Sequence, residues 1–193
     1  MLKIPCVIFA GGKSSRMGED KSLLPFDTYP TLLQYQHARL SQLFSSVYIS
    51  CKNSEKFSFD ANFLEEDYEV YAPTAGFVHT LHTLQEKKFF AISVDTPFID
   101  ETTITTLCNQ DKDDVDATVA KTPQGIQALC GIYHSSITPY FEKALQEGNH
   151  KLSFLLSQAN TQFINFDNTQ TFLNLNYPKE YQEALSLINT SSL

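Results

Sequence analysis

The chain has 193 residues, 42% of them hydrophobic and 19% charged, which is typical of a globular protein and fits one domain, residues 1–193. Its formal net charge of -8 excludes a general nucleic-acid-binding protein, because such proteins need a basic face. No apolar run reaches the roughly 20 residues of a membrane span, and the four cysteines are far apart, so we expect a cytoplasmic protein with reduced thiols and no membrane partner.

The N-terminal part of the chain combines an apolar run with a glycine-rich loop. Residues 3–10 predict a strand buried on both faces of a parallel sheet. The loop that follows is rich in glycine, which lets backbone N–H groups approach a ligand. Lys13, Arg16 and Lys21 lie within it, in a chain with only 14 Lys+Arg. We expect this loop to bind an anion, and the alternative is a solvated cationic turn.

Two common phosphate-binding patterns can be tested against the loop. A Walker A loop has four residues between its glycines and a lysine directly after the second, whereas five residues separate Gly12 from Gly18 and Lys21 comes later. The Gly-x-Gly-x-x-Gly pattern of dinucleotide-binding proteins is absent. The sequence therefore argues against a P-loop ATPase and against a dehydrogenase.

Strand and helix patterns alternate along the rest of the chain. We expect strands at 47–50, 89–94, 117–120, 127–133, 163–166 and 172–175, helices at about 30–43, 77–84, 101–109, 137–146, 152–156 and 178–188, and a loop with one helical turn at 53–69. This alternation predicts an α/β fold: a single, Rossmann-like domain with a mostly parallel twisted sheet and helices on both faces. Ligands of such folds bind at the carboxyl ends of the strands, which places the glycine loop, Asp95 and residues 73–76 around one crevice.

Several segments resemble those of a known enzyme family. The pattern Ala-Gly-Gly-x-Ser-x-Arg-Met-Gly-x-Asp-Lys resembles the signature of nucleotidyltransferases, and residues 9–26 are similar to the molybdenum cofactor guanylyltransferases in particular. Residues 73–76, 95–99, 132–136 and 172–178 resemble further motifs of that family, in the same order. The resemblance covers essentially the whole chain. It implies the fold of nucleotide-diphospho-sugar transferases, with a nucleotide-binding part at about 1–100 and an acceptor-binding part at about 101–193.

The resemblance implies transfer of GMP from GTP to the phosphate of molybdopterin, with Mg²⁺ as cofactor and pyrophosphate as leaving group. GTP, a molybdopterin-type acceptor and molybdoenzyme maturation proteins are the implied partners. Two alternatives stay open: a related cytidylyl- or sugar-phosphate nucleotidyltransferase, and a non-catalytic nucleotide- or cofactor-binding module. Ala10-Gly11-Gly12 favours the guanylyl branch, because the cytidylyl branch resembles Ala-Ala-Gly. Lys21 and Asp95 together argue against a mere binding module.

The family's phosphate-binding residues map onto the glycine loop. Because the reaction brings two anions together, neutralisation of charge is expected to dominate catalysis. We assign Lys21 to the α-phosphate, Arg16 to bidentate contact with phosphate oxygens, and Lys13 to the outer phosphates. The implied nucleotide-binding residues are Phe9, Ala10, Gly11, Gly12, Lys13, Lys21, Asp67 and Asp95.

Asp95 follows a predicted buried strand and is our candidate for the metal. Its hard carboxylate oxygens suit Mg²⁺, which uses few protein ligands and the phosphates of the substrate. An Asx turn or a helix cap before Pro97 is the alternative. The sequence does not indicate a second protein ligand.

The nucleoside contact is harder to place. Asp67 resembles the family's acidic residue before the Pro-x-Ala-Gly turn, but Glu66 or Glu65 could be its equivalent, and a solvated acidic loop is a further alternative. Asn53 is a weaker candidate. The turn itself departs from the family, because Ala72 replaces its usual first glycine.

Asn174 and Asn176 are the candidates for acceptor binding. They alternate with leucines, so in an extended segment both carboxamides would share one face while the leucines point to the core. Neutral amides suit a pterin or a phosphate. The alternative is that Asn176 or Tyr177 caps the helix that begins at Pro178; Tyr177 stands where the family usually has threonine.

Overall fold

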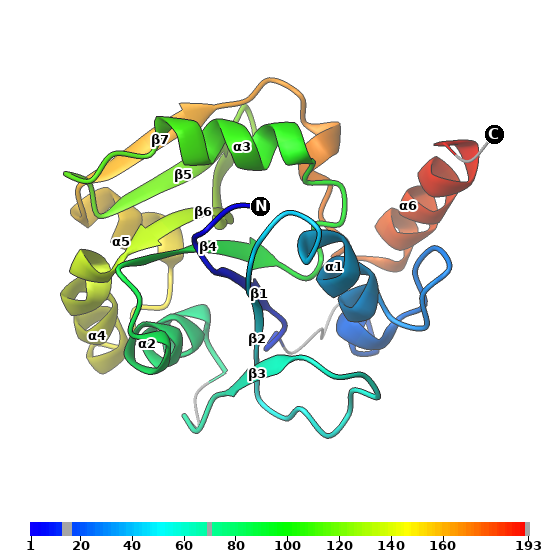
Figure 1. Ribbon diagram of the computed structural model, residues 1–193, viewed down its shortest axis with the longest axis horizontal. Coiled ribbons are helices and arrows are strands. Elements are labelled where there is room, and N and C mark those ends of the chain that lie inside the picture. The colour runs from blue at the N-terminus through cyan, green and yellow to red at the C-terminus, as the bar shows by residue number, and fades with distance from the viewer. Residues whose placement is uncertain (13–16, 69–70, 192–193) are drawn as a thin grey trace.

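The computed structural model describes residues 1–12, 17–68 and 71–191 and consists of one seven-stranded sheet with helices on both faces (Figure 1). The strands are β1 Cys6–Phe9, β2 Val47–Cys51, β3 Asn62–Glu65, β4 Lys88–Ser93, β5 Ala117–Thr122, β6 Gly125–His134 and β7 Thr161–Asn165. The α-helices are α1 Leu32–Leu40, α2 Pro73–Leu84, α3 Glu101–Gln110, α4 Thr138–Gln146, α5 Leu152–Gln158 and α6 Pro178–Ser191. Short 3-10 helices are η1 Lys21–Leu23, η2 Ser135–Ile137 and η3 Gln170–Phe172.

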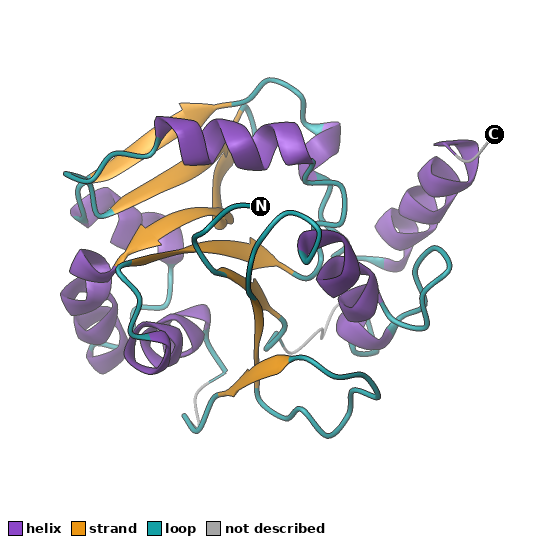
Figure 2. Cartoon of the chain, viewed as in Figure 1, coloured by secondary structure: helices purple, strands orange, loops and turns teal. Residues whose placement is uncertain are grey.

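The strand order is β3-β2-β1-β4-β6-β5-β7. Strands β3, β2, β1 and β4 run parallel, as do β5 and β7, whereas β6 is antiparallel to both of its neighbours (Figure 2). The predicted α/β fold with a mostly parallel sheet is therefore confirmed. The direction of β6 was not predicted, because an apolar strand pattern carries no information about the direction of its neighbours.

Alternation along the strands divides the core into two layers. In β1, Cys6 and Ile8 face a cluster formed with α1, α3 and α6, while Val7 and Phe9 face a second cluster formed with α2, α4 and α5. All four residues of β1 are buried. Burial of both faces explains why this strand reads as a continuous apolar run. The sheet is the middle layer of a three-layer sandwich.

Two predicted segments differ from the structure. Part of the predicted loop at 53–69 is the edge strand β3, which pairs in parallel with β2. This strand has only four residues and is exposed at both ends, so it lacks an apolar run. The predicted strand at 172–175 is wrong: η3 ends at Phe172, and the Leu175 N–H donates to the Asp95 carbonyl at 2.9 Å instead of joining a sheet.

Candidate active site

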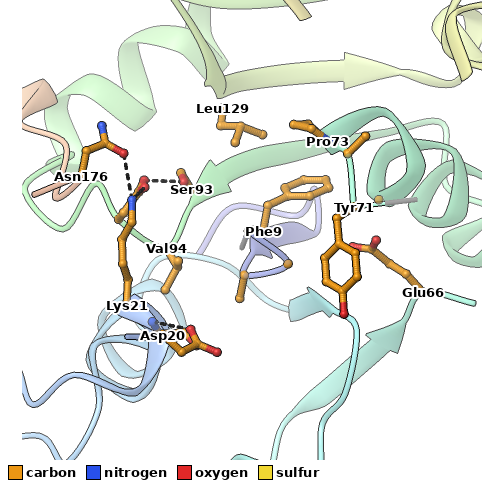
Figure 3. Close-up of a pocket in the computed structure, with 17 residues that line it drawn as sticks. Phe9, Asp20, Lys21, Glu66, Tyr71, Pro73, Ser93, Val94, Leu129 and Asn176 are labelled. Carbon is orange, nitrogen blue, oxygen red and sulfur yellow. Dashed lines mark hydrogen bonds and ion pairs between the residues drawn. The ribbon is translucent and has the colours of Figure 1, made fainter. Parts of the chain in front are cut away.

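The carboxyl ends of β1 and β4 open into a pocket of about 340 Å³. Its walls come from the glycine loop, from the start of α2 and from the segment after β4, as predicted. Figure 3 shows Lys21 and Asn176 on one side, Phe9 in the middle, and Glu66 and Tyr71 on the other. The described residues that line the pocket are Phe9, Ala10, Gly11, Gly12, Asp20, Lys21, Ser22, Glu66, Tyr71, Ala72, Pro73, Gly76, Ser93, Val94, Asp95, Leu129 and Asn176.

Lys21 and Asp95 form an ion pair at the edge of this pocket. The Lys21 Nζ lies 2.7 Å from Asp95 Oδ2, and Ser93 Oγ donates to Asp95 Oδ1 at 2.6 Å. The Lys21 and Asp95 side chains keep 12% and 14% of their exposure, so both are enclosed but can be reached from the pocket. Asp95 does not cap the helix that follows it. Asp100 caps α3, because its side chain accepts from the N–H of Thr103.

Asp20 fixes the start of η1, on which Lys21 lies. Its Oδ1 accepts from the N–H and the hydroxyl of Ser22, at 3.0 and 2.6 Å, and its Oδ2 lies 2.6 Å from Lys56 Nζ. Burial opposes the charge, but the hydrogen bonds from Lys56 and Ser22 hold the pKa of Asp20 below its usual value. The carboxylate therefore stays ionised beside Lys21 and caps η1. Asp20 was not among the predicted site residues, although aspartate is a preferred N-cap residue.

Glu66, and not Asp67, lines the pocket, together with Asp20 and Asp95 from other segments. Asp67 is 88% exposed in its side chain and pairs with His79 at 3.3 Å. Glu66 is 8% exposed; its carboxylate accepts from Ser50 Oγ at 2.9 Å and lies 3.2 Å from Lys52 Nζ. Asp67 therefore does not line this pocket, and Glu66, one of the alternatives that the sequence left open, does. Glu66 N–H bonds to the carbonyl of Cys51 just past the β2–β3 pairing, and this turns its side chain inward.

Two glycines make room for the Glu66 carboxylate. A Cβ atom at Gly76 would lie 2.8 Å from Glu66 Oε1, and a Cβ at Gly11 would lie 3.1 Å from the same oxygen. The first distance is shorter than real Cβ contacts, and the second is tight. The glycines of two motifs that are distant in sequence therefore serve one carboxylate.

The distant asparagines occupy different environments. Asn176 Oδ1 accepts from Lys21 Nζ at 2.8 Å and lines the pocket. Asn174 does not line it, and its buried Oδ1 accepts no hydrogen bond within the described part of the chain. The expected shared face is wrong because the segment is not a strand. The helix after it is held by Glu180, whose Oε2 accepts from the N–H groups of Asn176 and Tyr177 at 2.6 and 2.9 Å.

A bulge in β6 brings Leu129 to the pocket, where sequence gave no signal. Opposite β5, Val119 pairs with Gly131 while Ala120 pairs with Gln127, so residues 128–130 leave that ladder. The Tyr133 hydroxyl donates to the Ala128 carbonyl within the bulge. Bulges of this kind re-aim side chains near sites.

The predicted residues Lys13 and Arg16 lie outside the described residues. Over the described part of the chain, no three His, Cys, Asp or Glu side chains gather in a way that could hold a metal ion. No helix in the described ranges is both long and apolar enough to cross a bilayer. All four cysteines are free, and Cys6, Cys51 and Cys130 are buried, as expected.

Comparison with known proteins matches residues 6–162 to the family described as MobA-like NTP transferase domain. A molybdenum cofactor guanylyltransferase of Campylobacter jejuni is 36% identical over 186 residues, which cover 95% of this chain and 96% of that protein. One from Helicobacter pylori is 36% identical over 98% of this chain and 91% of its own length.

Solved structures share the fold. The crystal structure of molybdopterin-guanine dinucleotide biosynthesis protein A from Archaeoglobus fulgidus has a TM-score of 0.84 at 20% identity and covers 97% of this chain and 100% of its own. A 2-C-methyl-D-erythritol 4-phosphate cytidylyltransferase from Thermus thermophilus reaches 0.72 at 14% identity, over 97% of this chain and 100% of its own. At these identities the likeness concerns the fold alone.

Proposed function

The chain belongs to the family of MobA-like NTP transferase domains, and from this premise we propose that it transfers GMP from GTP to the phosphate of a molybdopterin-type acceptor. By its family it is a nucleotidyltransferase. The observation that carries the proposal is the contact between Lys21 and Asp95 beside Gly11 and Gly12, at the carboxyl ends of β1 and β4. A phosphate-binding loop, a cation and a hard anionic ligand meet there in one pocket.

In this reaction an oxygen of the acceptor phosphate attacks the α-phosphorus of GTP. A new P–O bond forms, the bond from the α-phosphorus to the bridging oxygen breaks, and pyrophosphate leaves with the electron pair. Both reactants are anions, and the chain itself carries a net charge of -8. A positioned cation is therefore the largest contribution that a side chain can make. Lys21 supplies it at the α-phosphate, while Lys13 and Arg16 remain predicted contacts to the other phosphate oxygens.

A divalent cation, for which we propose Mg²⁺, fits the Asp95 carboxylate. One carboxylate suits Mg²⁺, which completes its shell with water and substrate phosphates. The metal would orient the triphosphate and offset its charge. Ser93 holds one oxygen of Asp95 from the strand end, and the other now faces Lys21. When the triphosphate binds, Lys21 can move from Asp95 to a phosphate oxygen. The Asp95 carboxylate and the triphosphate then share the positive charge of Lys21 and of the metal.

We assign Glu66 to the nucleoside side of the pocket and the asparagines to the acceptor side. Glu66 lies beside Gly11 and Gly76, with its charge offset by Lys52. Asn174 keeps a buried oxygen that accepts no hydrogen bond from the described residues and could take one from a pterin. The division into a nucleotide part, about 1–100, and an acceptor part, about 101–193, is part of this proposal. So are delivery to molybdoenzyme maturation proteins and a cytoplasmic location.

One assay tests the function. The purified protein is incubated with Mg²⁺, molybdopterin and either GTP or CTP, and released pyrophosphate is measured. We expect release with GTP only, and the pterin guanine dinucleotide should appear in equal amount. Release with CTP alone would overturn the base assignment. No release with any nucleoside triphosphate, despite binding, would favour a module that binds without transfer.

A further inference from the structure

We propose that Asn176 is a positioning residue for Lys21, and that Glu180 in the first turn of α6 holds Asn176 in place. The inference rests on the proposed function for what Lys21 does, but its geometry is independent of that function. This positioning role is additional to the acceptor-side role proposed for Asn176, and it alone predicts that Asn176 and Glu180 affect the binding of GTP when no acceptor is present.

The side chain of Asn176 contacts Lys21 directly. Lys21 Nζ donates to Asn176 Oδ1 at 2.8 Å and to Asp95 Oδ2 at 2.7 Å, across 155 and 74 residues of sequence. A lysine ammonium sits on a flexible four-carbon stem, so its position is set by the acceptors around it. Asp95 is also the candidate metal ligand. When a cation takes up the Asp95 carboxylate, the hydrogen bond to Asn176 Oδ1 continues to orient the lysine.

Hydrogen bonds of the backbone hold Asn176 itself in place. Its N–H donates to Glu180 Oε2 at 2.6 Å and to the carbonyl of Asn174 at 3.0 Å. The N–H of Tyr177 donates to the same Glu180 oxygen at 2.9 Å. Leu175, on the other side, donates to the Asp95 carbonyl at 2.9 Å. The backbone of a segment without regular structure is thereby fixed on both sides of the residue that contacts Lys21.

Helix α6 also contacts the segment that carries Lys21. The Tyr181 hydroxyl donates to the carbonyl of Pro25, four residues after Lys21. Ala184 is fully buried in the core cluster that α6 shares with α1 and α3. Figure 1 shows α6 beside α1, although the two helices are far apart in sequence. The start of α6 therefore holds both partners of the bond between Lys21 and Asn176, and it is a rigid element on which this bond can depend.

Binding of GTP without an acceptor separates positioning from acceptor binding. The dissociation constant of GTP with Mg²⁺ is measured by calorimetry. We expect it to rise about tenfold in Asn176→Ala and about threefold to tenfold in Glu180→Ala, as for the loss of one hydrogen bond to a charged group. Glu180→Gln keeps an oxygen that can accept both N–H groups, and should restore most of the affinity. Glu183→Ala, an exposed position one turn further along α6, is the matched control and should change nothing.

A double-mutant cycle tests whether these residues act through Lys21. In a Lys21→Ala background, Asn176→Ala and Glu180→Ala should each change GTP affinity less than about twofold. Melting temperatures of all variants are recorded, so that a loss of folded protein is not mistaken for a loss of affinity. Equal effects with and without Lys21, or no effect in either background, would overturn the proposal.

A second readout needs no nucleotide. Trace acetic anhydride labels lysine amines in the folded protein, and mass spectrometry gives the extent of labelling at Lys21 relative to the other lysines. Lys21 should be labelled about threefold faster in Asn176→Ala and Glu180→Ala than in the unmodified protein or in Glu183→Ala, because loss of the contact lets the side chain, which is 12% exposed, reach the reagent. Unchanged labelling would count against the proposal even if GTP binds, whereas faster labelling without GTP binding would leave it standing and refute the proposed function alone.

Discussion

Strand β4 has a lysine–aspartate pair at each end. The two pairs have nearly the same N···O distance but differ in the exposure of the aspartate and in the donors that it accepts from. Asp95 follows the end of β4 and lies 2.7 Å from Lys21, whereas Lys88 begins β4 and lies 2.8 Å from Asp111. The Asp111 side chain is 2% exposed and also accepts from Thr118 and from His134 Nε2 at 3.0 Å. The Asp95 side chain is 14% exposed and lines the pocket.

The difference distinguishes an enclosed structural ion pair from one that lines a pocket. Asp111 receives donors from β4, β5 and β6, so it joins the end of α3 to three strands and has no place for a ligand. Asp95 receives one donor from its own strand end and one from Lys21, which lies on a short helix and can exchange its partner. We therefore expect changes at Asp111 to appear in stability and changes at Asp95 to appear in turnover.

The largest effect is expected for Asp95→Ala. Without this carboxylate the metal and the triphosphate lose their anchor, and turnover should fall by about 10³-fold or more. Loss of a part-buried pair should cost only about 1 kcal/mol of stability, to be checked by thermal unfolding. Asp95→Asn, which keeps the shape and removes the charge, is the control. Near-normal metal-dependent turnover in either variant would remove Asp95 from the metal site.

Lys21→Ala comes next. If Lys21 mainly meets the charge that develops at the α-phosphate, kcat should fall about 10²-fold to 10³-fold, and the KM for GTP should rise less, by about tenfold, as in Asn176→Ala. Steady-state kinetics with Mg²⁺, GTP and acceptor measures both. An unchanged kcat with a raised KM would assign Lys21 to ground-state binding and weaken the contrast between the two pairs.

At the other end of β4, Asp111→Ala should destabilise the fold by about 3 kcal/mol, because it leaves Thr118 and His134 without their shared acceptor and leaves Lys88 paired with the exposed Asp113. Urea unfolding measures this. Turnover per folded molecule should stay the same at a temperature where the variant is folded. A large fall in kcat would show that the two ends of β4 are coupled, and it would contradict the separation of a structural pair from a pair in the pocket.

The pH dependence of stability sharpens the same contrast. Burial opposes the charge of Asp111, but hydrogen bonds from Lys88, His134 and Thr118 hold its pKa below the usual value. A depressed pKa contributes stability above the unfolded pKa, about 3.9, and loses it as the pH falls through the folded pKa. The difference in unfolding free energy between the unmodified protein and Asp111→Asn should therefore shrink between about pH 5 and pH 2. A difference that stays constant with pH would contradict this linkage.

The sheet and the crevice could be predicted because they depend on local patterns. Buried strands such as β1 and β4 are continuous apolar runs, and ligands of parallel sheets gather at the carboxyl ends. Asp95 was placed correctly because it directly follows such a run. The pair of Lys88 and Asp111 could not be predicted, since Asp111 begins an acidic stretch typical of a solvated loop, and its burial depends on β6, which comes later in the chain.

Side-chain direction could not be predicted where no regular element fixes it. Glu65, Glu66 and Asp67 are consecutive acids, and only the end of the short β3 decides which of them points inward. The asparagines alternate with leucines as a strand would, yet the segment crosses the carboxyl edge of the sheet and bonds to Asp95. The contact between Asn176 and Lys21 joins positions that no local pattern relates.

Glu66 combines features of both lysine–aspartate pairs. Gly76→Ala tests whether its carboxylate depends on the space that Gly76 leaves, and it is expected to have the smallest effect of these variants. Like Asp111 it is nearly enclosed, with 5% of its side chain exposed and Lys52 as cation, but like Asp95 it lines the pocket. An alanine Cβ would lie 2.8 Å from Glu66 Oε1, so the carboxylate must move. We expect the KM for GTP to rise about tenfold, with kcat changed less, as for one displaced hydrogen-bonding group. Glu66→Asp withdraws the carboxylate, so in the double variant the added methyl should cost less than it does alone. Equal cost in both backgrounds would mean that Gly76 is required for a reason other than the space it leaves to Glu66.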